Sequence, residues 1–284
     1  MITTIDAHQH FWQYHPQRHS WINDQMAILK QDFLPADLER IFQENDVQGC
    51  IAVQADQSEE ETDFLLGLAT KYSIIKGVVG WIDLCADNVE ERLQYYSKFP
   101  MVRGFRHIVQ DEPDPNFMLK EAFQRGISCL EKYGFTYDIL IYPTQMEAAL
   151  KTIQNFPNQK FVIDHLAKPY IKKGQTPGWE KHMIAFAESP NVYCKVSGMV
   201  TEADWKNWRY ENFVPWLDVV FSAFGTDRIM YGSDWPVCLL AGTYAKVKQI
   251  IKRYLEPFTK EQQAKIWGMN AIHFYDIEKR FYAK

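Results

Sequence analysis

The chain has 284 residues, with 46% hydrophobic and 24% charged side chains, a composition typical of a globular protein with a buried core. Its formal net charge is −5, and no stripe of Lys and Arg is interleaved with aromatic residues, which argues against a nucleic-acid partner. No apolar run approaches the roughly 20 residues that span a bilayer, and the N-terminus lacks the layout of a signal peptide. The five cysteines include no C-x-x-C pair, as expected for reduced thiols. We expect a cytoplasmic protein without membrane contact.

Eight β-rich runs recur along the chain and are separated by helical patterns. In chain order the runs cover residues 3–11, 49–56, 75–84, 102–109, 136–142, 160–167, 191–198 and 228–236. Helical patterns cover residues 35–45, 58–72, 88–99, 116–133, 144–156 and 259–275. Three pairs have the spacing of a capping box, which predicts a helix start at each: Ser58 with Glu61, Thr144 with Glu147, and Thr259 with Gln262.

The alternation of strands and helices predicts the fold class. It indicates parallel strands joined by right-handed crossovers. Eight such units fit a single α/β domain, a (β/α)8 TIM barrel over residues 1–284, because this fold typically takes about 250 residues. A doubly wound open sheet is the alternative, but no G-x-G-x-x-G or Walker loop follows any strand. The long irregular stretch at about residues 12–35 is expected to be a lid or a substrate loop.

The first run, in MITTIDAHQHFW, ends with two histidines one residue apart. Strand alternation predicts that His8 and His10 share a face with Thr4 and Asp6, with the two imidazoles about 7 Å apart. Such a pair can bind a metal ion or an oxygen atom of a substrate.

Polar side chains are concentrated at the carboxyl ends of the runs, where a barrel of this type has its active site. His165 ends the sixth run, and alternation places Asp164 on the opposite face. Asp234 ends the eighth run, which neighbours the first in a closed barrel. Three histidines and a carboxylate would supply a base for water and donors for an oxyanion. The same ends carry Gln54, Trp81, Asp83, Arg106, His107, Lys195 and Ser197.

Several of these residues also have a purely structural interpretation. A histidine beside an aspartate is often structural, and Asp234 before Pro236 is typical of a turn or helix N-cap. Lys195 could extend its ammonium group to solvent, and Arg106 could form a salt bridge at the barrel rim. Alternation allows one of Arg106 and His107 to face inward and does not select between them.

The motifs DAHQHFW, GFRH, DHLAKP, VYCKVSG and YGSDWP resemble the amidohydrolase superfamily, in the branch that includes the sugar-lactone and dicarboxylate-lactone hydrolases. The resemblance runs over essentially the whole chain and implies a barrel that hydrolyses a cyclic ester. Binuclear members carry a bridging lysine or glutamate on the fourth strand and a histidine on the fifth. This chain has VRGFRHIV and TYDILIY there, so a two-metal centre is not expected.

A single metal ion remains an option within the resemblance. His8, His10, His165 and Asp234 have the ligand count of a mononuclear zinc site. The lactonase branch works without a required metal, and the alkoxide leaving group of a lactone needs weaker protonation than an amine. We therefore expect no required cofactor, with zinc as a possible ligand of this site.

The resulting hypothesis makes Asp234 the general base towards water, while His8, His10 and His165 donate to the oxyanion. The predicted substrate contacts are Arg106, His107, Trp21, Gln54, Trp81 and Lys195. A dicarboxylate would need two or more converging arginines, whereas tryptophan faces and neutral polar groups suit a sugar ring. The expected partner is therefore a small sugar lactone, an aldonolactone of a 6-deoxy sugar such as L-fucono- or L-rhamnonolactone.

Two other functions stay open. A metal-dependent decarboxylase of the same superfamily would hold zinc tightly and lose its activity on chelation. A barrel that merely binds a sugar acid would not require a buried base at Asp234. A homo-oligomer is compatible with the sequence, which does not determine the oligomeric state.

Overall fold

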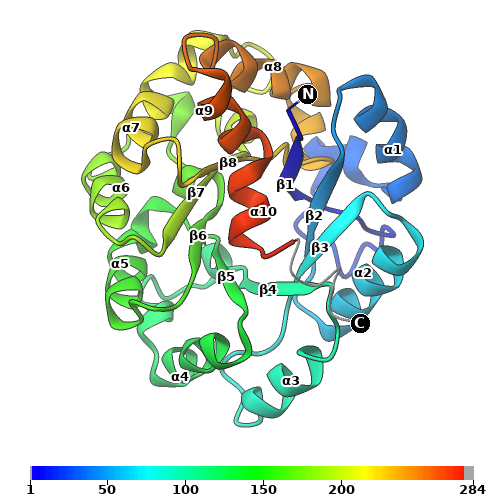
Figure 1. The fold of residues 1–284 in the computed structure, drawn as a ribbon, viewed down its shortest axis with the longest axis vertical. Helices are drawn as coiled ribbons and strands as arrows, with labels where there is room; N and C mark the ends of the chain where they lie inside the picture. The colour runs from blue at the N-terminus through cyan, green and yellow to red at the C-terminus, as the bar shows by residue number, and fades with distance from the viewer. Residues whose placement is uncertain (1, 278–284) are drawn as a thin grey trace.

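The computed structural model describes residues 2–277, which form a ring of parallel strands surrounded by helices (Figure 1). The strands pair in chain order from β1 to β8. Next to β8, the Asp234 amide donates to the His8 carbonyl and Trp235 bridges Gln9, which joins the eighth strand to the first. The predicted (β/α)8 barrel is therefore confirmed. The strands are β1 (Ile5–Gln9), β2 (Gly49–Val53), β3 (Ile75–Gly80), β4 (Val102–His107), β5 (Thr136–Ile139), β6 (Phe161–Ile163), β7 (Val192–Val196) and β8 (Ile229–Tyr231).

Helices follow the strands and cover the outside of the ring (Figure 1). They are α1 (Pro35–Glu44), α2 (Glu59–Lys71), α3 (Val89–Tyr96), α4 (Glu121–Leu130), α5 (Met146–Asn155), α6 (Trp179–Ala187), α7 (Val214–Phe224), α8 (Tyr244–Tyr254), α9 (Lys260–Ala264) and α10 (Asn270–Phe274). A π-helical turn at Lys265–Met269 joins α9 to α10, so the predicted stretch 259–275 is helical throughout its interior.

The predicted capping boxes have different outcomes. The Thr259 box is complete, and the Ser58 hydroxyl accepts from the Glu61 amide as expected. The prediction for Thr144 is wrong, because Thr144 lies inside a short 3₁₀ turn before α5 and its side chain caps nothing. The side-chain hydrogen bond at this turn is made by Gln145, whose oxygen accepts from the Tyr142 amide at the start of the 3₁₀ turn.

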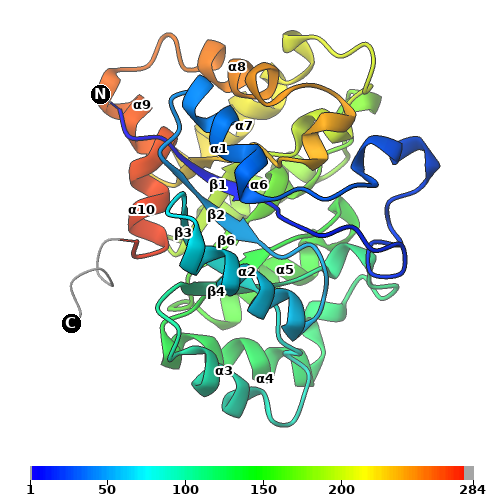
Figure 2. The same cartoon turned by 90° about the vertical axis from the view of Figure 1, so that its right-hand side faces the viewer.

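One end of the barrel is closed by the C-terminal helix. The interior side chains of the strands, such as Ile5, Val79 and Met230, form a cluster with Phe274 and Tyr275 from the α10 region. Figure 2 shows α10 on one side of the barrel and the loop between β1 and α1 on the opposite side. The accessible end of the barrel is therefore the one formed by the carboxyl ends of the strands.

The pairing of β1 with β2 has a register shift between Asp6 and Gln9. Ala7 and His8 both turn towards the barrel interior, whereas the Asp6 carboxylate accepts from the Ser233 amide and the Tyr244 hydroxyl of α8. The prediction that Asp6 shares a face with His8 and His10 is therefore wrong. The irregularity brings the rings of His8 and His10 to a centroid distance of 5.0 Å, edge to face.

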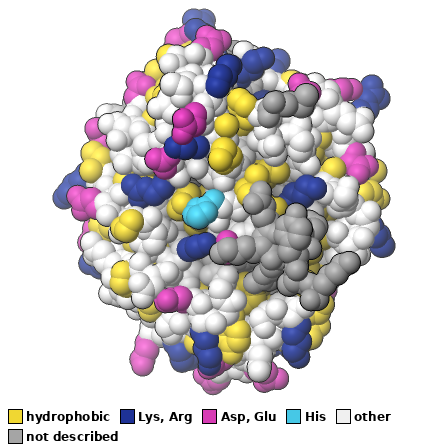
Figure 3. Space-filling view, in the orientation of Figure 1, with side chains coloured by type: hydrophobic (Ala, Val, Ile, Leu, Met, Phe, Trp, Pro, Cys, Tyr) yellow, Lys and Arg dark blue, Asp and Glu magenta, His cyan; other side chains and the backbone are white. Residues whose placement is uncertain are grey.

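The surface around α10 carries Lys and Arg intermixed with Asp and Glu, without a field of one sign (Figure 3). No helix within residues 2–277 is long and apolar enough to cross a membrane. All five cysteines are free thiols, and Cys50, Cys194 and Cys238 are buried.

Candidate active site

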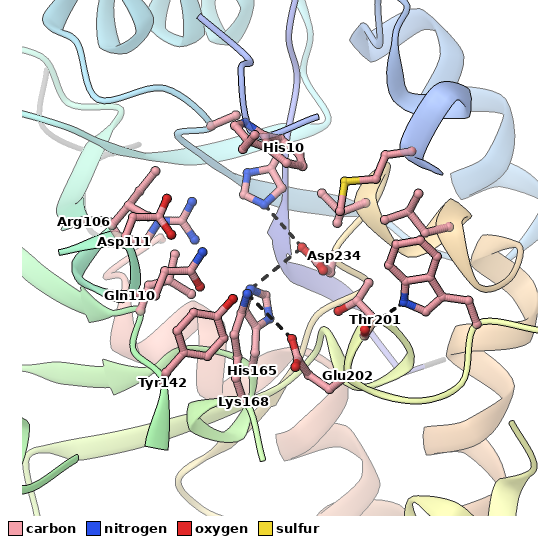
Figure 4. A pocket seen from close by; sticks show the side chains of 18 residues that line it. His10, Arg106, Gln110, Asp111, Tyr142, His165, Lys168, Thr201, Glu202 and Asp234 are labelled. Carbon is pink, nitrogen blue, oxygen red and sulfur yellow. Dashed lines mark hydrogen bonds and ion pairs between the residues drawn. The ribbon is translucent and has the colours of Figure 1, made fainter. Parts of the chain in front are cut away.

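A cavity of about 390 Å³ opens at the carboxyl ends of the strands (Figure 4). It lies within the size range of small-molecule sites. Trp21 and Met26 of the loop after β1 form part of its wall. Its polar lining is His10, Arg106, Gln110, Asp111, Tyr142, His165, Lys168, Thr201, Glu202 and Asp234, and its other apolar lining is Ala55, Ile108, Leu140, Trp205, Val237 and Leu240.

His10 faces Asp234 across the cavity floor, with Nε2 3.4 Å from Oδ1 (Figure 4). The other ring nitrogen, Nδ1, lies 2.8 Å from the carbonyl oxygen of Val53. A carbonyl can only accept, so Nδ1 carries a proton and donates to Val53. Nε2 is therefore the ring nitrogen that His10 turns to the Asp234 carboxylate.

His165 reaches the cavity through unusual backbone geometry. It begins a run of four residues with positive φ, from +53° at His165 to +48° at Lys168. Such a left-handed stretch costs roughly 1–2 kcal/mol per non-glycine residue. The ring packs directly against Gly198 of the next strand end, where a Cβ atom would lie 2.4 Å from Nδ1. Gly198, itself at φ +62°, therefore makes room for the imidazole.

Asp164, the residue before His165, turns into the barrel rather than away from it. Its carboxylate contacts His8 Nδ1 at 3.2 Å, Arg106 Nη1 at 3.1 Å and Lys195 Nζ at 3.0 Å. Lys195 also bonds Asp138, so two carboxylates and two cations balance one another beneath the cavity. The prediction that Asp164 occupies the face opposite to the site is wrong, because β6 ends at Ile163 and strand alternation no longer applies.

Burial and neighbouring charges set the protonation of the site. Burial lowers the pKa of both His8 and His165 well below the usual range, so both rings are neutral at pH 7. Burial alone would raise the pKa of Asp234, but His165, His10 and Lys168 outweigh it and hold this pKa below its ordinary value. Asp234 is therefore an ionised carboxylate although only 4% of its surface is exposed.

Arg106 is the residue of β4 that faces inward. Its guanidinium lines the cavity, and its Nη2 bonds both the backbone and the side-chain oxygen of Gln54. Gln54 is thereby held behind the wall of the cavity. His107 points the other way, stacks on Phe117 at 4.8 Å and pairs with Glu112.

Of the other predicted substrate contacts, one lines the cavity and two do not. Trp21 lines the cavity. Lys195 does not, because it is fully buried among Asp138, Asp164 and His8. The indole Nε1 of Trp81 faces His107 Nδ1 at 3.3 Å, outside the lining. His8 is also covered completely, with its two nitrogens turned to Asp164 and Arg106.

Sequence reasoning missed six polar residues of the cavity lining, Gln110, Asp111, Tyr142, Lys168, Thr201 and Glu202, and it also missed the contact of Asp164 with Arg106 beneath them. Lys168 had a signal, since it stands three residues after His165 in DHLAKP. Glu202 and Thr201 lie in a 3₁₀ helix (Met199–Glu202) after β7, and Tyr142 follows β5. Only the folded positions of these loops over the strand ends show that the three residues line the cavity.

The site fits a single divalent ion by the chemistry of its donors. Ligand atoms of His8, His10 and Asp234 lie within 4.8 Å of one another. His10 is oriented by the Val53 carbonyl, as imidazole ligands usually are. His8 is less suited, since Arg106 and Lys195 place positive charge 3.2 and 3.3 Å from its two nitrogens. Of this group, His10 and Asp234 are the residues better placed to hold a metal.

The protein is a (β/α)8 barrel that carries histidines at the ends of its first and sixth strands and an aspartate after its eighth. This is the arrangement expected of an amidohydrolase. The model of the amidohydrolase family matches residues 5–277, and the chain belongs to this family. It is 36% identical to the L-fucono-1,5-lactonase of Burkholderia multivorans, with 96% of each chain covered. It is 34% identical to the L-fucono-1,5-lactonase of Burkholderia ambifaria, with 98% of this chain and 97% of the relative covered. A crystal structure of an amidohydrolase from Burkholderia multivorans with bound zinc matches with a TM-score of 0.92 at 35% identity, covering 96% and 99% of the two chains.

Proposed function

We propose that this protein hydrolyses a neutral sugar lactone to the open-chain sugar acid, with a 6-deoxy aldonolactone such as L-fuconolactone as the preferred substrate. The observation that carries the proposal is the ionised Asp234, held between His10 and His165 on the floor of a cavity of suitable size. Whole-length relatives named L-fucono-1,5-lactonase support the same reaction.

Asp234 acts as the general base. It takes a proton from a water molecule, whose oxygen attacks the lactone carbonyl and forms a tetrahedral intermediate. The intermediate collapses with cleavage of the bond between the carbonyl carbon and the ring oxygen. The proton held by Asp234 passes to that ring oxygen, and the product is a hydroxy acid. A carboxylate that is ionised throughout the physiological pH range is ready for each new cycle.

The oxyanion requires a donor that faces the cavity. His8 is covered completely, and His10 donates Nδ1–H to the Val53 carbonyl and turns Nε2 to Asp234. His165 is the remaining histidine, and the Ser197 hydroxyl lies 2.8 Å from its Nδ1. When this hydroxyl donates to Nδ1, the proton of the neutral ring is on Nε2, which points to the cavity. We therefore assign this donation to His165, while His8 positions Arg106 and Asp164.

The charges of the lining favour a neutral substrate. Asp111, Glu202 and Asp234 contribute three carboxylates, whereas the cations are Arg106 and Lys168. Arg106 already pairs with Asp164, so a dicarboxylate would meet repulsion rather than a pair of free arginines. The apolar part of the wall suits the methyl group of a 6-deoxy sugar.

A divalent ion bound by His10 and Asp234 would polarise the lactone carbonyl as a Lewis acid. The chain itself supplies a base and a donor, and a lactone has a good leaving group. We therefore expect hydrolysis to proceed without a bound metal.

The test is acid release from a panel of freshly prepared aldonolactones, before and after chelation and dialysis. Hydrolysis that survives metal removal supports a metal-independent lactonase. Loss of activity that zinc restores would overturn the metal-free mechanism and leave the lactonase function intact. Failure to hydrolyse any lactone, with stoichiometric zinc in the purified protein, would overturn the proposal in favour of a decarboxylase.

A further inference from the structure

We propose that Lys168 and Glu202 together bind neighbouring hydroxyl groups of the sugar ring and so determine which lactone the enzyme accepts. The inference rests on the proposed lactonase function and assigns the substrate-recognition part of the same cavity. Both side chains belong to loops beyond the strand ends, and both line the cavity beside His165 and Asp234 (Figure 4).

The backbone that carries Lys168 is strained in a way that serves the cavity. Lys168 is the last residue of the left-handed run that His165 begins. Four successive non-glycine residues at positive φ are costly, and such strain clusters at functional sites. The run turns His165 and Lys168, three residues apart, towards the same cavity (Figure 4). A structural salt bridge at the rim would not require this conformation.

The pair keeps its hydrogen-bonding capacity. Lys168 Nζ lies 3.8 Å from Glu202 Oε1, which is an ion pair but too long for a hydrogen bond. Within residues 2–277, the ion-pair partner of each terminal group is the other one, at that distance. The two side chains are only 15% and 18% exposed, so their ammonium and carboxylate groups face an enclosed site rather than open solvent.

Adjacent charges of opposite sign suit a neutral polyol. A carboxylate accepts from one hydroxyl while an ammonium group donates to the next, and the pair adds no net charge to the site. Aromatic faces complete the arrangement: Lys168 Nζ lies 5.3 Å from the centre of the Tyr142 ring, and Trp205 is also part of the lining. Such faces pack against the C–H side of a sugar ring.

The experiment combines variants with substrate analogues. Values of kcat/KM are measured for the parent lactone and for analogues that each lack one ring hydroxyl, using wild type, Glu202→Gln and Lys168→Met. For wild type we expect loss of the recognised hydroxyl to lower kcat/KM by about 10- to 100-fold, as for a hydrogen bond to a charged group. In each variant this discrimination should shrink to a few-fold, with the loss expressed mainly in KM.

The controls are Lys172→Met and Glu211→Gln, at exposed positions outside the cavity lining. Lys172 forms a similar ion pair with Asp204 at 3.9 Å but is 69% exposed, and the Glu211 side chain is 66% exposed. Both controls should discriminate as wild type does. Unchanged discrimination in folded Glu202→Gln and Lys168→Met, with thermal melts like that of wild type, overturns the inference and leaves the lactonase function standing. Absence of lactone hydrolysis by wild type overturns the proposed function itself.

Discussion

His165 and Asp234 face one another across the cavity, with Nε2 3.9 Å from Oδ1, and both lie on left-handed backbone at φ +53° and +59°. The two residues belong to different strand ends, β6 and β8. Their positions are held by neighbours: the Asp234 amide donates to the His8 carbonyl, and His165 packs on Gly198. The strained geometry is therefore part of the site before any substrate arrives.

The first prediction concerns the base. Asp234→Asn should lower kcat on the order of 10²–10⁴-fold, because asparagine cannot take a proton from water. Asparagine tolerates positive φ, so the fold should persist. Steady-state kinetics on the preferred lactone measure the effect, with Asp227→Asn, whose side chain is 72% exposed, as the control. Near-normal turnover in Asp234→Asn would exclude this residue as the base.

The second prediction separates backbone strain from contact with His165. Gly198→Ala and Gly134→Ala both place alanine at positive φ, +62° and +69°. Both should lose about 1 kcal/mol or more of the free energy of unfolding. A new Cβ at position 134 has open space around it, whereas one at position 198 meets the imidazole. We expect at least a tenfold loss of kcat in Gly198→Ala alone, and equal activities would argue against a role for the position of His165.

The third prediction concerns the buried charges beneath the cavity. Lys195→Met removes a fully buried cation from between Asp138 and Asp164. Leaving carboxylates unpaired in the interior should cost about 3–5 kcal/mol of the free energy of unfolding. Adding Asp138→Asn removes one of those charges and should restore part of the loss. Urea denaturation of the single and double variants tests this, and a double variant less stable than Lys195→Met would refute the charge balance described.

The fourth prediction is a pH dependence of stability. Burial raises the pKa of Glu61 from 4.5 to about 7, despite the hydrogen bond that it accepts from the Ala55 amide. The folded protein then keeps a proton that the unfolded chain releases above pH 4.5, so stability falls as the pH rises towards 7. Relative to Glu61→Gln, wild type should lose about 3 kcal/mol over that interval. Urea denaturation at successive pH values measures the difference, and parallel curves for the two proteins would contradict it.

The barrel was predictable because its signals are local and repeated. Each strand has a short β-rich run, the first five crossovers each have a helical pattern, and the count of eight strands selects closure. The same logic brought His8, His10, His165 and Asp234 to one end of the sheet. It failed where a strand is irregular or has ended. The register shift in β1 turned Asp6 outward, and the end of β6 at Ile163 released Asp164 from alternation.

The sequence by itself determined the family and the barrel, and it predicted that His10, His165 and Asp234 would lie at the same end of the strands, where all three line the cavity. Periodicity and residue type are local properties of the chain, and they are sufficient to predict strands, helices and the residues at the strand ends. Tertiary structure decided which polar groups meet in the cavity, because this depends on loop paths between distant strands. It placed Lys168 and Glu202 in the wall, and it buried Lys195 beneath the floor. Burial and the neighbouring His165, His10 and Lys168 together set the pKa of Asp234. These neighbours come from distant parts of the chain, so no local sequence pattern encodes that pKa.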